Sequence, residues 1–160
     1  MTDIAREFIQ DSRDFLARDY MQKIEQCVAG MTDEQLWSRA NDASNSIGNL
    51  ILHLTGSSRY WAVEVIGTTP IGRVRQGEFD QRDPIRADRL IDDLRAAMVD
   101  VDRVLASLTE RDLLETRPAR GDESVRVLWA VYHIVEHFGM HTGQIVSMAK
   151  AMRGEVSFSE

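Results

Sequence analysis

The sequence contains one cysteine, three prolines and no long hydrophobic run. A single cysteine, Cys27, cannot form an internal disulfide, and its place in the helical stretch IEQCVAG favours a small, partly buried side chain over a catalytic thiol. No apolar run approaches the roughly 20 residues that a membrane span requires. The opening residues MTDIAREF show no charged-then-apolar export signal. We therefore expect a cytoplasmic protein with no membrane partner.

The charge distribution also excludes a class of partner. The formal charge is −7, and acidic and basic residues are mixed along the whole chain without a basic block that could follow a phosphate backbone. Nucleic acid is therefore not an expected partner. With 160 residues and 43% hydrophobic content, the chain fits one domain over residues 1–160, of which 154–160 form a short polar tail.

Four long helical stretches are predicted, separated by loops that carry the turn residues. The predicted stretches are residues 3–29, 44–67, 87–108 and 122–153. In the third, apolar residues recur at three- and four-residue steps from Leu90 to Leu108, as on an amphipathic helix. Alternating strand patterns are absent. The sequence therefore predicts an all-α fold, a four-helix bundle, whose core is a usual place for a metal site.

All four histidines can be directed at one place. His133, His137 and His141 follow one another at two i,i+4 steps, and His53 lies in the second stretch. On a helix the three fan over about 80° of one face. Helical projection places them among Ile134, Met148 and other apolar residues, so they face the core rather than solvent. Several buried imidazoles without strong partners are costly, whereas metal coordination satisfies them. The pattern therefore predicts a metal site.

Geometry leaves two ligand pairs open on the fourth helix. Residues i and i+8 are about 12 Å apart along a helix, so His133 and His141 are not expected to share one ion. His137 belongs to either remaining pair, with His133 or with His141. A third ligand is expected from another helix, where His53 is available.

A polar stripe accompanies His53 on the second helix. Asn49, Ser57, Tyr60 and Glu64 project within roughly 40° of it, whereas Thr55, Ser58 and Arg59 on the opposite side account for the solvent face. We interpret the stripe as the wall of a cavity. Asn49 and Tyr60, together with Gln144 from the fourth helix, are the predicted substrate-binding residues.

Two motifs carry a family resemblance. NSIGNLILHL after a DEQLW loop, together with HIVEHFGMHTGQI near the C-terminus, resembles the DinB-like superfamily of small bacterial four-helix proteins. The resemblance implies metal ligation by His53, His137 and His141. It places His133 one turn before the pair, near the cavity and not among the ligands, where it is a further substrate-binding candidate. It also implies an up-down-down-up bundle with a long crossover over residues 67–86.

The resemblance implies a class of reaction. Some DinB-like proteins are thiol S-transferases that use bacillithiol or mycothiol, and others are mycothiol-dependent isomerases. The working prediction is a transferase that joins a small-molecule thiol to an electrophile, with one divalent ion as cofactor, zinc first and nickel next. Related bundles lead us to expect a homodimer. The alternatives are a metal-dependent hydrolase and a non-catalytic, stress-related metal-binding protein.

Two other histidine chemistries fit the sequence poorly. Metalloproteases with an HExxH motif need a glutamate directly after the first histidine, and here that position is Phe138. Haem bound by paired histidines is disfavoured because nothing marks a porphyrin attachment site.

Overall fold

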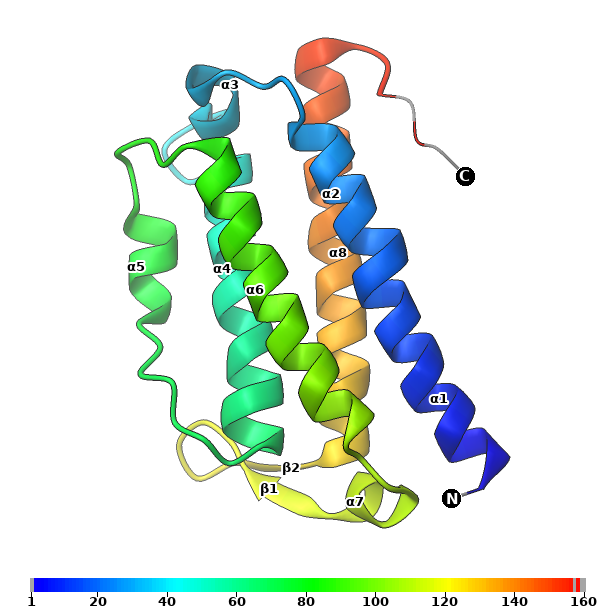
Figure 1. Cartoon of the computed structure of the whole chain (residues 1–160). Helices are drawn as coiled ribbons and strands as arrows, with labels where there is room; N and C mark the ends of the chain where they lie inside the picture. The colour runs from blue at the N-terminus through cyan, green and yellow to red at the C-terminus, as the bar shows by residue number, and fades with distance from the viewer. Residues whose placement is uncertain (1, 157, 159–160) are drawn as a thin grey trace.

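Four long helical segments pack side by side along most of their length (Figure 1). The structure, a computed structural model, describes residues 2–156 and 158. The first segment comprises α1 (Asp3–Asp14), the π-helical η1 (Phe15–Tyr20) and α2 (Met21–Val28), the second α4 (Ile47–Arg59) and the π-helical η2 (Tyr60–Ile66), the third α6 (Ala87–Ala106) and the fourth α8 (Val127–Arg153).

The order of directions is up, down, down, up, as the resemblance implied (Figure 1). The second and third segments run the same way, so the chain between them must return along the bundle. It does so as a crossover that contains the short helix α5 (Arg75–Asp80) and lies against α4. The four-helix bundle and its long crossover are therefore confirmed, and part of the crossover is helical where a loop was predicted.

A small hairpin corrects the prediction that strands are absent. Strand β1 (Thr116–Pro118) pairs antiparallel with β2 (Ser124–Arg126) directly before α8. The two strands have three residues each, too few to show an alternating pattern in the sequence. Their presence moves the start of the last helix to Val127, later than the predicted start near Asp122 or Ser124.

Two short helices, which the sequence analysis did not predict, complete the connections. They are α3 (Asp33–Trp37) and α7 (Glu110–Leu114), and each begins with a capping box. In α3 the Trp37 indole donates a hydrogen bond to the Ile85 carbonyl at 3.0 Å. Trp37 also lies over Gly48, where a Cβ atom would come within 2.7 Å of the indole. The DEQLW segment, predicted as a loop, is thus the helix α3, and its Trp37 holds the end of the crossover against the start of α4.

The helices pack around a core of mostly aliphatic side chains, to which α4 contributes many residues. Leu54 of α4, Leu94 of α6 and Phe138 and Ile145 of α8 are fully buried. Polar groups also lie in this interior, among them Asn49 and His53 on α4. Within the described residues, none of the helices combines the length and the apolar character that crossing a bilayer requires.

Candidate metal centre

Three histidines from two helices converge in the bundle. Helix α4 supplies His53, and α8 supplies His137 and His141 one turn apart. The Nε2 atoms of His53 and His141 each lie 3.1 Å from Nε2 of His137. A ligand atom of each histidine lies within 4.8 Å of those of the other two. We call this group the histidine triad.

The spacing of the triad fits a single ion. Nitrogens bound at about 2.0–2.1 Å in a tetrahedral shell lie about 3.3 Å apart, close to the 3.1 Å seen here. One divalent ion between the three rings is therefore compatible with these two distances, and the remaining pair of ligand atoms lies within 4.8 Å.

Hydrogen bonds on the outer side of two rings strengthen that conclusion. Nδ1 of His53 donates to Oε2 of Glu78 at 2.9 Å, and Nδ1 of His141 donates to Oε1 of Gln144 at 2.7 Å. In a neutral imidazole with its proton on Nδ1, the Nε2 lone pair is free. Both lone pairs are then directed at His137, whose Nε2 can supply only one proton. A cation satisfies all three nitrogens at once.

Burial keeps the imidazoles in the form that can ligate. Burial is the main cause that lowers the pKa of His137 to about 3, and the positive charges of protonated His141, His53 and His133 add to it. Burial also lowers the pKa of His141, against the hydrogen bond that this ring donates to Gln144, which acts to raise the pKa. Neutral imidazole is the metal-binding form, so near neutral pH little competition from protons is expected at these two rings.

The crossover contributes a supporting ion pair that the sequence analysis missed. Glu78 of α5 contacts His53 and also accepts two hydrogen bonds from Arg73, from Nε at 2.6 Å and from Nη2 at 2.8 Å. Burial acts to raise the pKa of Glu78, but the hydrogen bonds and charges of Arg73 and His53 outweigh it and hold the pKa below its usual value. Glu78 is thus ionised behind His53, as in carboxylate–histidine–metal arrangements.

Gly56 makes room for this ion pair. It lies one turn after His53 on α4, and a Cβ atom there would collide with Oε1 of Glu78 and come within 3.0 Å of Nε of Arg73. The signal available in the sequence was the charged run between Arg73 and Asp80 in the crossover. No pattern in one sequence relates that run to a histidine 25 residues earlier.

His133 lies outside the triad. Its ring stacks on Trp129 with centroids 4.9 Å apart and planes 10° apart, and it meets the edge of Trp61 at 5.0 Å. Its Nδ1 lies 3.7 Å from a carboxylate oxygen of Glu136. Burial lowers the pKa of His133. Of the two pairs that geometry left open, the structure therefore brings His137 and His141 together with His53.

The three other predicted substrate-binding residues have different surroundings. The Asn49 amide is fully buried and is engaged by Ser46, Arg39 and the carbonyl groups of Glu78 and Gln81. It therefore joins the start of α4 to the crossover. Tyr60 and Gln144 each line a cavity.

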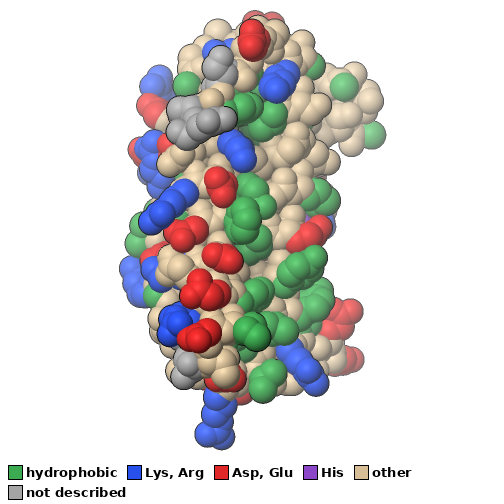
Figure 2. All heavy atoms as spheres, turned by 90° about the vertical axis from the view of Figure 1, so that its right-hand side faces the viewer, with side chains coloured by type: hydrophobic (Ala, Val, Ile, Leu, Met, Phe, Trp, Pro, Cys, Tyr) green, Lys and Arg blue, Asp and Glu red, His purple; other side chains and the backbone are tan. Residues whose placement is uncertain are grey.

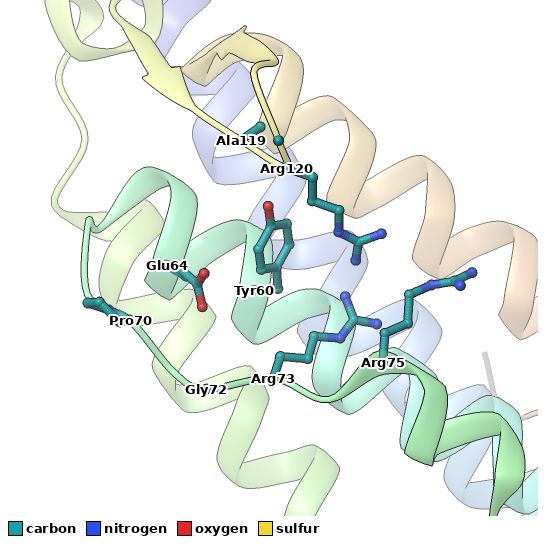
Figure 3. Close-up of a pocket in the computed structure, with 9 residues that line it drawn as sticks. Tyr60, Glu64, Pro70, Gly72, Arg73, Arg75, Ala119 and Arg120 are labelled. Atoms are coloured by element: carbon teal, nitrogen blue, oxygen red, sulfur yellow. The ribbon is translucent and has the colours of Figure 1, made fainter.

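One cavity adjoins the triad at His141, and a second is lined by Arg73, the neighbour of His53. The first, of about 460 Å³, is lined by His141 and Gln144 together with residues of α4, α8 and the loop before α4. The other, of about 690 Å³, lies between η2, the crossover and the hairpin turn, and Tyr60 and Arg73 line it (Figure 3). The first gives a small molecule access to the triad beside His141.

Comparison with known proteins gives a family and several similar structures. The mycothiol-S-transferase family matches residues 12–154. YfiT from Bacillus subtilis, described as a probable metal-dependent hydrolase with an unusual four-helix bundle topology, has a TM-score of 0.73 at 17% identity, covering 95% of this chain and 90% of that one. A DinB-like protein from Bacillus cereus has a TM-score of 0.69 at 15% identity, covering 97% of each chain.

A conserved protein from Enterococcus faecalis has a TM-score of 0.67 at 19% identity, covering 91% of this chain and 97% of that one. At these identities the three structures are evidence for the fold alone. None of the curated proteins matches the sequence.

Proposed function

Because the chain belongs to the mycothiol-S-transferase family, we propose that it transfers a low-molecular-weight thiol to an electrophilic substrate at a divalent metal site formed by His53, His137 and His141. The predicted DinB-like resemblance is confirmed by the family match over residues 12–154, and the similar structures show the same fold. The observation that carries the proposal is the convergence of three imidazole nitrogens with Glu78 and Gln144 hydrogen-bonded behind them.

The ligand set defines the chemistry that the site can supply. A divalent ion held by three neutral imidazoles keeps its full charge and an open position, which lowers the pKa of a thiol bound there. His137, with its low pKa, stays unprotonated and available as a ligand. Glu78 holds His53 in the orientation that directs Nε2 inward.

The cavity beside His141 offers a place for the reacting molecules. Gln144 lines it and fixes the His141 ring, so the same amide couples the cavity wall to the triad. We propose Gln144 and Tyr60 as substrate-contacting residues, His133 as a side chain at the edge of the site, and Asn49 as a residue that positions the crossover. Zinc is the proposed ion and nickel the second choice, because imidazole ligands suit both.

A conjugation assay tests the proposed function. We expect zinc-loaded protein to accelerate the reaction of mycothiol, bacillithiol or glutathione with 1-chloro-2,4-dinitrobenzene by at least about tenfold over chelator-stripped protein, and His53→Ala to remove the acceleration with the helical circular dichroism intact. If no thiol reacts faster while the metal still stabilises the fold, the chain is a metal-binding protein. Metal-dependent ester or amide cleavage without thiol dependence would make it a hydrolase.

We further propose that the chain forms a homodimer in the cytoplasm. A band of hydrophobic side chains runs along the face formed by the first and fourth helical segments (Figure 2). Exposed large hydrophobic residues on these segments are Ile4, Phe15, Leu128, Trp129, Tyr132 and Met140. Sedimentation equilibrium should give twice the chain mass, and Tyr132→Lys should shift it toward one chain. A wild-type protein of single-chain mass at micromolar concentration would contradict this arrangement.

A further inference from the structure

The larger cavity is built from three parts of the chain that are distant in sequence. Helix η2, the crossover and the hairpin turn meet there (Figure 3). It has a volume of about 690 Å³, and the side chains that distinguish it are Tyr60, Glu64, Arg73, Arg75 and Arg120. Three arginines at one cavity contrast with a chain whose formal charge is −7.

Arg73 has a buried donor without an acceptor. Its side chain is 6% exposed, and its Nε and Nη2 atoms are both occupied by Glu78. Nη1 is buried and has no hydrogen-bond partner. A buried guanidinium N–H without an acceptor is costly, so this atom marks a place where an acceptor from outside the chain would be bound favourably.

Arg120 brings a second guanidinium to the same aromatic ring. Its Cζ atom lies 4.9 Å from the centroid of Tyr60, and that of Arg73 lies 5.8 Å from it. Figure 3 shows the two guanidinium groups beside Tyr60, whereas that of Arg75 points away; Arg75 packs on Phe79 at 4.9 Å. Two like charges on one ring repel each other, and an anion between them would remove that repulsion.

Acidic groups at the cavity limit the charge of the ligand. Glu78 is already paired with Arg73, and Oε2 of Glu64 accepts a hydrogen bond from the Ile71 amide at 3.1 Å. The guanidinium groups that face the Tyr60 ring, those of Arg73 and Arg120, are matched by these two carboxylates, so the cavity carries no large positive excess. This balance favours a group with a single negative charge over a doubly charged phosphate.

We propose that this cavity binds a carboxylate group of a small molecule, with Arg73 Nη1 and Arg120 as donors and the Tyr60 ring as a wall. The site itself is inferred from the arginines, and the inference that the bound molecule is a substrate rests on the proposed thiol transfer. Arg73 relates the two sites, because its Nη2 atom lies 3.3 Å from Nδ1 of His53. A molecule held by Arg73 therefore lies close to His53, on the Nδ1 side of its ring.

A matched pair of probes tests the binding site without any reaction. Benzoate and benzamide have nearly the same shape and differ in charge. We expect isothermal titration calorimetry of the metal-loaded full chain to give an affinity for benzoate at least about tenfold higher than for benzamide, decreasing as salt is added. Equal affinities, or no benzoate binding, would overturn the proposal.

Two arginine variants and one control locate the contact. Arg120→Gln, on an exposed turn, should weaken benzoate about tenfold, and Arg73→Met should abolish its binding. Arg126→Gln removes the same charge from an exposed position of the same hairpin and should leave benzoate binding unchanged. Because Arg73→Met also removes the partner of Glu78, Arg120→Gln is the deciding variant. An equal loss in Arg126→Gln would contradict a defined site.

A second measurement shows which substrate carries the carboxylate. Initial rates are compared for N-acetylcysteine against its amide, and for 3-maleimidopropionic acid against its amide. We expect one charged substrate to have a KM at least about tenfold below that of its neutral partner, and Arg120→Gln to remove that advantage. If neither pair responds, the substrate role is wrong. Benzoate binding is measured without a thiol, so failure of thiol transfer leaves that test unaffected.

Discussion

His133 and His137 lie one turn apart on α8, and their surroundings differ in the features that matter for a metal. Nε2 of His137 meets two other imidazole nitrogens at 3.1 Å, whereas the ring of His133 is stacked on Trp129. The opposite segment causes the difference, since α4 places His53 against His137 and η2 places Trp61 against His133. Identical side chains on one helix thus take different roles according to what the neighbouring segment presents.

The largest expected effect separates these two histidines directly. His137→Ala removes the nitrogen that both other triad members approach, so we expect zinc affinity to fall at least about 100-fold. His133→Ala removes a ring that lies outside the triad and should change zinc affinity less than about threefold. Competition titration with a chromogenic chelator measures both. The reverse ranking would move the metal site one turn along α8.

The next prediction concerns Glu78, the carboxylate that accepts a hydrogen bond from His53 of the triad. Glu78→Gln preserves the size of the side chain and removes its charge, so we expect zinc affinity to fall about tenfold, at the low end for outer hydrogen-bonding partners of metal ligands. Asp80→Asn, an equal charge change at an exposed position of α5, is the control and should leave the affinity unchanged. Equal losses in the two variants would show that only the overall charge matters.

A third test concerns the stability of the metal-free protein, where the effect at any one pH step is small. The pKa of His137 is about 3 in the fold, against 6.5 as its ordinary value, so the unfolded chain binds the extra proton between these pH values. The free energy of unfolding should therefore fall as pH drops from about 6.5 toward 3, by at most about 1.4 kcal/mol per pH unit from this group. Urea titrations with chelator present should show a shallower fall in His137→Asn.

If the free energy of unfolding falls with pH as steeply in His137→Asn as in the wild type, the His137 imidazole does not have the lowered pKa that its burial causes. The same series in His133→Asn extends the comparison, since burial lowers the pKa of His133 as well. Well above the ordinary histidine pKa of 6.5, both variants should show no pH-dependent difference from the wild type, because the histidines are then neutral in the folded and unfolded chains alike.

Local patterns predicted the parts of the structure that depend on one helix at a time. Apolar periodicity follows from the helical repeat, so it identified the third segment and the inward face of α8, whereas turn residues in the loops bounded the other segments. The i,i+4 spacing placed His137 and His141 on one stripe for the same reason. The hairpin before α8 and the helices α3, α5 and α7 were missed, because elements of three to six residues are too short to show periodicity.

The amino-acid sequence by itself determined the helical segments, the inward histidine stripe and the family motifs, since these depend on residues a few positions apart. Only the tertiary structure decided that His53 lies against His137 and so completes the triad. It also decided that the crossover places the Glu78–Arg73 ion pair beside His53, and that Arg120 lies over Tyr60 at a second cavity. The physical reason is distance along the chain. Contacts between residues 25 to 84 positions apart depend on how whole segments pack, and no local repeat encodes that packing.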